Sequence, residues 1–217
     1  GGVFMNVKAN KVIAELPEVE YFEAFPSCGD ESLPFGAYYQ TIAKEKGPDK
    51  VCPLRNIYTG TALDDAETER LIRSSGFPYE RPENMAERLA GLLAGGFPVA
   101  RCAGRTEFGA RALGNRSILA DPSDKDVVRI INQMIKKRDF WMPFAPMMKK
   151  DKSEQYIVNP KHLDSPYMMM TFDTRDNYLD LIAAVHNADL TCRAQLLDED
   201  QNPEMYAIID AFEQKTG

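Results

Sequence analysis

The sequence predicts a mixed α/β fold of the α+β type, and three observations lead to this prediction. Of the 217 residues, 44% are hydrophobic and 27% are charged, which is ordinary for a globular domain. Segments with helical periodicity alternate with short apolar runs typical of strands. The longest apolar cluster, at residues 167–172, is far shorter than the roughly 20 residues that span a bilayer, so no membrane segment is expected.

The first part of the chain is expected to form a hairpin, a short helix and a linker. Residues 3–7 and 11–14 are apolar-rich, and Ala9-Asn10 between them is typical of a turn. The short helix is expected at about residues 36–46. Residues 47–63 combine Gly and Pro with little periodicity, which indicates a linker.

The rest of the chain is expected to alternate helices with strands. The helices are recognised by capping residues or closing glycines, and they are expected at residues 66–75, 84–94, 124–137 and 203–216. Strands are expected at residues 97–102, 167–173 and 191–197. The inward face of the helix at 124–137 is expected to consist of Val127, Val128, Ile131, Met134 and Ile135.

Cysteine usage and the chain ends indicate a fragment of a cytoplasmic protein. The four cysteines form no Cys-x-x-Cys pair and no signal peptide precedes them, as expected for reduced thiols. The chain opens at Gly1-Gly2 without a methionine and stops directly after its last helix, where a further strand is expected.

Charge is distributed unevenly along the chain. The net charge of −7 argues against binding to nucleic acid by bulk charge. Residues 101–138, in contrast, hold nine basic and four acidic side chains, a net charge of +5. A positive segment of this size in an acidic chain favours a small anion as the ligand over a long polyanion.

The densest part of this segment interleaves glycines with arginines. Glycines let backbone amides approach an anion closely, and guanidinium groups match the oxygen atoms of phosphate. The stretch therefore predicts a phosphate pocket built from Arg105, Arg111, Asn115, Arg116 and Ser117. The alternative is a solvated loop whose arginines pair with Glu107 and Asp121, and the composition leaves both open.

Two features near the start suggest chemistry of their own. Gly1, Gly2 and Asn6 combine a flexible turn with an amide, which suits the approach of a nucleotide. Asp30 lies on a glycine-containing loop, where a capping role is the alternative. Because the chain has only two histidines, a metal site built wholly from it is not expected.

Residues 104–122, which read GRTEFGARALGNRSILADP, resemble the signature of the O-carbamoyltransferase family. That family includes the nodulation, tobramycin and cephem carbamoyltransferases. The resemblance continues through Asn132, Lys136 and Arg138, through residues 143–146 and into residues 186–193. It covers nearly the whole chain, and a motif of this length is highly specific.

The resemblance implies two parts of a longer enzyme. Residues 1–47 would be the tail of an actin-like ATPase domain of the threonylcarbamoyl-transferase type, residues 48–60 a linker, and residues 61–217 most of a YrdC-like domain. The YrdC-like domain would combine carbamoyl phosphate with ATP to give carbamoyl-adenylate and pyrophosphate. The actin-like domain would then pass the carbamoyl group to a hydroxyl group on a small-molecule acceptor.

Cofactors and site residues follow from the same resemblance. ATP would bring Mg²⁺, the complete actin-like domain would hold Fe²⁺ or another divalent ion, and assembly into a homodimer is left open. The catalytic positions would be Lys136 and Arg193, which match the family's carbamoyl-phosphate-binding positions. The phosphate groups of the substrates would be bound by Arg105, Arg111, Asn115, Arg116, Ser117 and Arg138. Nucleotide would be bound by Gly1, Gly2 and Asn6, and the metal ion by Asp30.

Two positions depart from the family pattern. Met142 stands where the family has an arginine directly before Pro-Phe-Ala-Pro, and Ala110 stands where a proline is usual. A missing arginine would weaken phosphate binding by about 1.5–3 kcal/mol, the value of a charged hydrogen bond. Met142 therefore favours the alternative, a non-catalytic YrdC-like module that binds a phosphorylated ligand, a nucleotide or RNA. The fragment alone is not expected to turn over substrate.

Overall fold

The computed structural model describes residues 2–137, 139 and 142–217, apart from the side chains of Met134 and Lys136. Its α-helices are α1 Val7–Glu15, α2 Leu33–Lys46, α3 Asp65–Ser74, α4 Met85–Ala94, α5 Asp126–Ile130 and α6 Pro203–Thr216. Its strands are β1 Val99–Cys102, β2 Arg116–Leu119, β3 Met147–Lys149, β4 Ile157–Val158, β5 Phe172–Thr174, β6 Thr191–Cys192 and β7 Gln195–Leu197. Short 3₁₀ segments occupy Gly2–Met5, Asp30–Ser32, Pro48–Lys50, Lys150–Gln155 and Tyr178–Ala184, and a π-helical turn occupies Ile131–Lys136.

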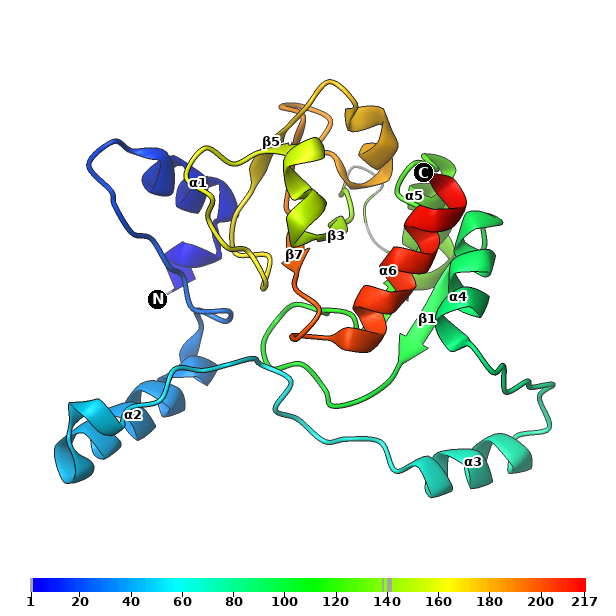
Figure 1. The fold of residues 1–217 in the computed structure, drawn as a ribbon, viewed down its shortest axis with the longest axis horizontal. Coiled ribbons are helices and arrows are strands. Elements are labelled where there is room, and N and C mark those ends of the chain that lie inside the picture. Colours follow the sequence, from blue (N-terminus) through cyan, green and yellow to red (C-terminus); the bar gives the residue numbers. More distant parts are fainter. Residues whose placement is uncertain (1, 138, 140–141) are drawn as a thin grey trace.

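The strands form three small sheets rather than one large sheet (Figure 1). β1 and β2 make an antiparallel hairpin in which Val99 pairs with Leu119 and Cys102 with Arg116. β3 and β7 are parallel, and β4, β5 and β6 form an antiparallel sheet in that order. The mixed α/β architecture of the α+β type is therefore confirmed.

The helices differ in how far they are buried. α4 and α6 lie side by side (Figure 1), and Leu93 of α4 packs against Met205 and Ile208 of α6. Asn84 and Asn202 cap the first turns of these helices through their side-chain oxygens. α2 and α3 project outward and contain no buried residue. None of the helices in the described part of the chain is long and apolar enough to cross a membrane.

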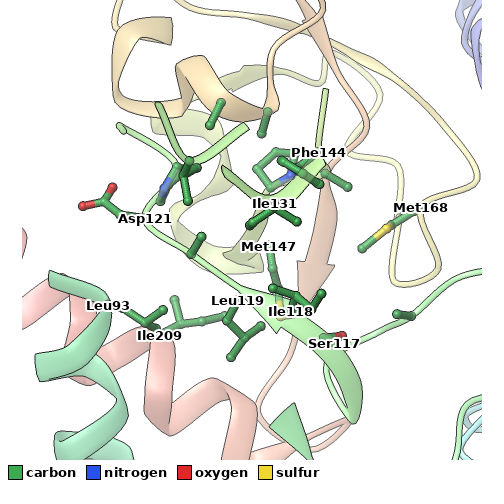
Figure 2. A pocket seen from close by; sticks show the side chains of 18 of the residues that line it. Leu93, Ser117, Ile118, Leu119, Asp121, Ile131, Phe144, Met147, Met168 and Ile209 are labelled. Atoms are coloured by element: carbon green, nitrogen blue, oxygen red, sulfur yellow. The ribbon is translucent and has the colours of Figure 1, made fainter. Parts of the chain in front are cut away.

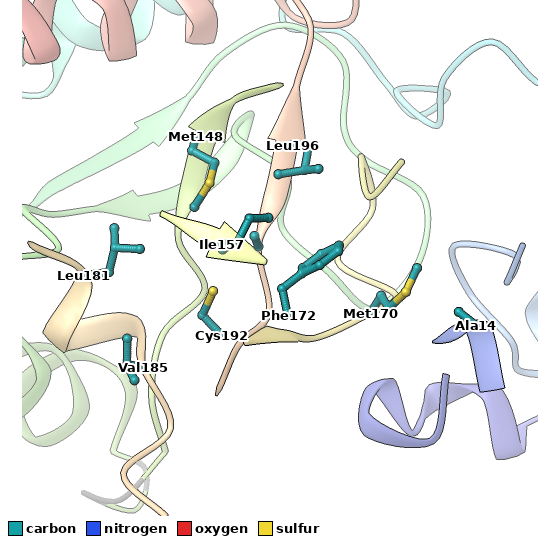
Figure 3. Packing of buried hydrophobic residues seen from close by; sticks show 10 residues of the cluster. Ala14, Met148, Ile157, Met170, Phe172, Leu181, Val185, Cys192 and Leu196 are labelled. Carbon is teal, nitrogen blue, oxygen red and sulfur yellow. The ribbon is translucent and has the colours of Figure 1, made fainter. Parts of the chain in front are cut away.

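The largest hydrophobic cluster joins the N-terminal helix to strands far along the chain (Figure 3). α1 contributes Ala14 to it. The other buried members are Met148, Ile157, Met170, Phe172, Leu181, Val185, Cys192, Ala194 and Leu196. The position of α1 is therefore set by burial against the later strands.

Polar contacts also hold the end of α1. The Lys161 ammonium group donates to the carbonyl oxygens of Ala14, Leu16 and Val19 at 2.7, 2.6 and 2.7 Å. These carbonyls lie at or just beyond the C-terminal end of the helix, where intrahelical donors run out. A cation there also stabilises the negative end of the helix dipole.

The predicted hairpin within residues 3–14 is wrong, because this segment is helical. Asn6 caps α1 by accepting the backbone N–H of Ala9 through Oδ1 at 3.1 Å. Asn10, expected in a turn, is fully buried, and its side-chain amide donates to the carbonyl of Met169 at 2.7 Å. Because that partner is far away in the sequence, local patterning does not reveal it.

Other expected elements are confirmed in part. The helices expected at 36–46, 66–75, 84–94 and 203–216 and the strand expected at 97–102 correspond to α2, α3, α4, α6 and β1. The strand expected at 167–173 shrinks to β5, since the methionines before it are buried in irregular backbone with Met168 at a φ of 56°. The helix expected at 124–137 is α5 followed by the π turn, and Ile135, expected to face inward, is 52% exposed. Strands β2, β3 and β4 have no counterpart in the prediction.

Replacing Lys161 by methionine keeps the apolar stem of the side chain and removes its hydrogen bonds to the end of α1. We expect Lys161→Met to lower the free energy of unfolding by about 2 kcal/mol, the scale of hydrogen bonds to a charged group. Urea unfolding followed by circular dichroism measures this change. Lys46→Met, at the exposed end of α2, is the control and should cost well under about 1 kcal/mol. Equal losses for the two variants would contradict the role given to Lys161.

Candidate functional site

Residues 104–115, the first part of the signature stretch, form the loop between β1 and β2, and this loop contains a buried carboxylate. Glu107 is 9% exposed. Its Oε1 accepts the backbone N–H groups of Leu113, Asn115 and Arg116 at 2.9, 2.7 and 3.0 Å. Hydrogen bonds to an ionised acceptor are roughly twice as strong as neutral ones. These amides are therefore occupied by a side chain of the protein itself.

The remaining amide of this turn is also used internally. Gly114 donates its N–H to Ser117 Oγ at 2.9 Å. The expectation that the glycine-rich backbone presents its amides to a bound anion is therefore wrong for residues 113–116. Glu107, which the alternative interpretation pairs with arginines, binds main-chain donors instead. An external anion bound here would therefore have to be held by groups other than the amides of residues 113–116.

Gly109 lets the loop run close to the early part of the chain. Its φ of 100° lies in the left-handed region, and a Cβ there would lie 3.0 Å from the Cβ of Ser27. Next to it, the ring of Phe108 packs on Phe25 and Phe35 at centroid distances of 6.4 and 4.8 Å. The signature loop and residues 25–35 are therefore neighbours, although about 80 residues separate them in the sequence.

Arg105 points to the expected linker rather than into a cavity. Its Nε and Nη2 donate to the carbonyl oxygens of Tyr58 and Thr59 at 3.1 and 2.8 Å. Backbone pairing extends this contact, since the N–H of Phe108 donates to the carbonyl of Ile57 at 2.7 Å. Arg105 therefore fastens the linker to the signature loop, and its guanidinium group is engaged with the backbone.

Arg116 and Asn115 also hold the loop together. Arg116 donates from Nη1 to the carbonyl of Ala103 at 2.6 Å and from Nη2 to that of Gly104 at 3.2 Å. Asn115 is buried, and its Oδ1 accepts from the side-chain amide of Asn202, the cap of α6, at 2.9 Å. Four of the five polar residues expected to bind phosphate in this loop thus make structural hydrogen bonds: Arg105, Asn115, Arg116 and Ser117.

Two cavities meet beside the loop. The first, which we call the apolar cavity, has a volume of about 460 Å³. It lies between the β1–β2 hairpin, the π turn and α6 (Figure 2), and its apolar wall includes Leu93, Ile118, Leu119, Ile131, Phe144, Met147 and Ile209. The polar residues on its wall are Arg111, Arg116, Ser117, Asp121 and Arg193. Figure 2 shows the carboxylate of Asp121 turned away from the apolar side chains.

The second cavity, which we call the polar cavity, has a volume of about 630 Å³. It reaches the start of α1, and its wall includes Lys8, Thr171, His186, Asp189 and Thr191. Arg111, Pro143, Phe144, Ala184 and Arg193 line both cavities. The two cavities therefore share a wall, and that wall contains two guanidinium groups that the sequence analysis singled out.

Arg111 is the most exceptional of the signature arginines. Burial lowers the pKa of its guanidinium group. Its Nε is buried and has no hydrogen-bond partner within the part of the chain that the structure describes. An unsatisfied buried donor on a charged group is costly, and an anionic ligand would remove that cost. Arg111 is therefore suited to bind an oxyanion at the shared wall.

A charged group from α1 completes the polar cavity. Lys8 Nζ lies 2.7 Å from Asp189 Oδ2, and this hydrogen bond holds the pKa of the Asp189 carboxyl well below its usual range. Asp189 Oδ1 lies 3.3 Å from Nδ1 of His186. Lys8, Thr171 and Thr191 are not among the site residues predicted from the sequence. No local signal marks them, because they meet only when α1 packs against the later strands.

The remaining expected site residues lie elsewhere. Gly2 starts a 3₁₀ turn, Asn6 caps α1, and exposed Asp30 starts a second 3₁₀ turn. Among the described residues, no group of three or more His, Cys, Asp or Glu side chains comes together to hold a metal ion. Gly1, Arg138 and the side chain of Lys136 are outside the described residues, so their expected roles stay predictions.

Comparison with known proteins bears on the whole chain. Residues 90–217 match the family model described as carbamoyltransferase C-terminus. The nodulation protein NolNO of Sinorhizobium fredii is 36% identical over 168 residues, 76% of this chain and 25% of that protein. An uncharacterized protein of Methanocaldococcus jannaschii is 33% identical over 216 residues, 96% of this chain and 40% of that protein.

A third relative extends the comparison to the full chain. Nodulation protein U of Bradyrhizobium diazoefficiens is 31% identical over 218 residues, 100% of this chain and 36% of that protein. The chain therefore spans less than half the length of these relatives. Because the family model matches more than half of the chain, the chain belongs to the carbamoyltransferase C-terminus family.

Proposed function

We propose that this chain is the phosphate-binding part of an ATP-dependent O-carbamoyltransferase. Family membership supports carbamoyl transfer as the reaction class. The observation that carries the proposal is the shared wall, where Arg111 and Arg193 line both cavities and the Nε of Arg111 lacks a partner among the described residues. Carbamoyl phosphate is a small acyl phosphate whose anionic end matches guanidinium groups in this setting.

The surroundings of the arginines strengthen their effect on an anion. The adjoining cavity is lined mainly by apolar side chains, so water screens the charges less than it would on the surface. Cavities of about 460 and 630 Å³ are within the usual size range of small-molecule sites. Space on both sides of the arginines suits two substrates that each have phosphate groups, carbamoyl phosphate and ATP.

In this proposal the residues of the chain bind and orient, and they form no covalent bond with substrate. Water cleaves carbamoyl phosphate to carbamate and inorganic phosphate, and a carbamate oxygen then attacks the α-phosphorus of ATP, which gives carbamoyl-adenylate and releases pyrophosphate. Arg111 and Arg193 neutralise phosphate charge and hold the acyl phosphate in place during these steps. Transfer to an acceptor hydroxyl group belongs to an actin-like domain, of which residues 1–47 are the tail. Residues 48–60 are the linker and residues 61–217 the YrdC-like part. Lys136 and Arg138 remain proposed phosphate ligands.

The metal ion of the proposed reaction is Mg²⁺, which binds together with ATP. Mg²⁺ commonly binds through substrate phosphates and keeps several waters, so it does not need a cage of protein ligands. Asp30 is exposed, and the described residues offer it no cluster of further His, Cys, Asp or Glu ligands. The residues present therefore do not fit a resident Fe²⁺ site, and no step is assigned to such an ion.

A second candidate function is a YrdC-like module that binds a phosphorylated ligand, a nucleotide or RNA without catalysis. Met142 favours it, because this side chain lines the polar cavity together with Arg111 and Arg193, at the position where an arginine is expected. The cavity thus has one cation fewer than the family pattern implies. The two candidates differ in turnover and agree in phosphate binding.

Measuring the affinity of the 217-residue chain for carbamoyl phosphate distinguishes the role of Arg111 from that of Arg105. We expect Arg111→Ala to weaken binding at least tenfold, the scale of one charged hydrogen bond. Arg105→Ala is the control, because its guanidinium group is engaged by Tyr58 and Thr59, and it should change the affinity less than about threefold. Isothermal titration calorimetry measures both, with thermal unfolding to confirm that each variant is folded. Equal affinities for wild type and Arg111→Ala would refute the proposed site.

Turnover distinguishes the enzyme from the binding module. In the full-length protein we expect Met142→Arg to raise pyrophosphate release from ATP and carbamoyl phosphate by about tenfold, because it adds a cation to the phosphate-binding wall. Met142→Leu, which adds no charge, should leave the rate unchanged. No release from either the parent or Met142→Arg would favour the non-catalytic module.

A further inference from the structure

Glu107 closes the loop that carries Arg111. The side chain of Glu107 reaches the amide of Leu113, so the residues between them form a ring closed by a hydrogen bond of 2.9 Å. Arg111 is one of the residues of this closed loop, between Glu107 and Leu113 in the sequence. Two further bonds, to the amides of Asn115 and Arg116, tie the same carboxylate to the first residue of β2. One buried carboxylate therefore ties the backbone before Arg111 to the backbone after it.

The carboxylate also occupies the place where a ligand anion would otherwise bind. Backbone N–H groups that converge on one point form an anion-binding nest. Here the nest of residues 113, 115 and 116 surrounds Glu107 Oε1. A phosphate that entered it would have to displace a resident charge. Arg111 instead lines both cavities, and its buried Nε has no hydrogen-bond partner among the described residues.

We propose that Glu107 is the positioning residue of this site, a resident anion that fills the amide nest and thereby fixes Arg111 for the ligand. Its effect on carbamoyl phosphate binding rests on the proposed function, whereas its occupation of the nest does not. Loss of the carboxylate should leave three donors free in a pocket shaped for one carboxylate oxygen. A small carboxylate supplied in solution can then take its place.

The test combines carbamoyl phosphate binding with rescue by formate in Glu107→Ala. We expect Glu107→Ala to weaken carbamoyl phosphate binding about tenfold or more, since misplacing a binding group by about 1 Å has effects of this size. Formate should restore the affinity to within about threefold of wild type, whereas formamide, which has no charge, should not. If Glu107→Ala lost affinity only because its structure was disturbed, formate and formamide would have the same effect on the affinity.

Glu204→Ala is the matched control. It also removes a carboxylate beside this hairpin, because Glu204 Oε2 lies 2.6 Å from Nη2 of Arg101 on β1. It does not touch the nest, so formate should not change its affinity for carbamoyl phosphate. Amide chemical shifts of residues 113, 115 and 116, followed by NMR during a formate titration, should move in Glu107→Ala and stay constant in wild type.

Glu107→Gln keeps the test valid if Glu107→Ala does not fold. Glutamine retains an acceptor oxygen of the same reach without the charge, so the affinity should fall several-fold and the three amide signals should shift. Unchanged affinity in Glu107→Gln, or a folded Glu107→Ala whose amides ignore formate, would overturn the role of Glu107. If wild type fails to bind carbamoyl phosphate but formate still shifts the three amide signals of Glu107→Ala, the role of Glu107 as the anion of the nest is supported and the proposed function is refuted.

Discussion

One buried carboxylate organises the loop that carries Arg111, the residue on which the proposed function depends. Glu107 gathers three backbone N–H groups of the turn before β2 on a single oxygen atom, and this turns a glycine-rich loop into a defined scaffold. The residues next to these amides make further contacts that hold the loop. The side chain of Asn115 accepts a hydrogen bond from Asn202, the cap of α6. The guanidinium group of Arg116 donates to the carbonyl oxygens of Ala103 and Gly104 at the start of the loop. A loop with this composition in solution would be flexible, because each glycine adds conformational freedom.

The same arrangement divides the basic residues into two groups. Arg105 and Arg116 use their guanidinium groups to bind backbone carbonyls, so they stabilise the fold. Arg111 and Arg193 lie on the wall between an apolar and a polar cavity. Within residues 101–138, Arg105 and Arg116 thus serve the structure, and Arg111 is the arginine proposed to bind the ligand. The net excess of basic residues in this part of the chain reflects both uses.

Local sequence patterns are enough to predict an element whose conformation is determined by residues within that element. α4 and α6 are predicted because asparagine caps and apolar faces mark them, and Arg111 is singled out because arginines interleave with glycines. Long-range contacts decide the rest. Asn10, predicted in a turn, lies in a helix and donates a hydrogen bond to the carbonyl of Met169. Arg105, predicted to bind phosphate, instead donates to the carbonyl oxygens of Tyr58 and Thr59. The wall of the polar cavity brings Lys8 of α1 next to Asp189, far along the chain, so no pattern within one segment predicts this cavity.

The most direct measurement of the central claim is a crystal structure of the 217-residue chain soaked with carbamoyl phosphate. The phosphate is expected to contact the guanidinium groups of Arg111 and Arg193 at the wall between the two cavities. Glu107 is expected to keep its three amide partners in the same crystal. Density for the phosphate on the amides of residues 113–116, with the Glu107 side chain displaced, would contradict the claim that side chains alone bind the anion.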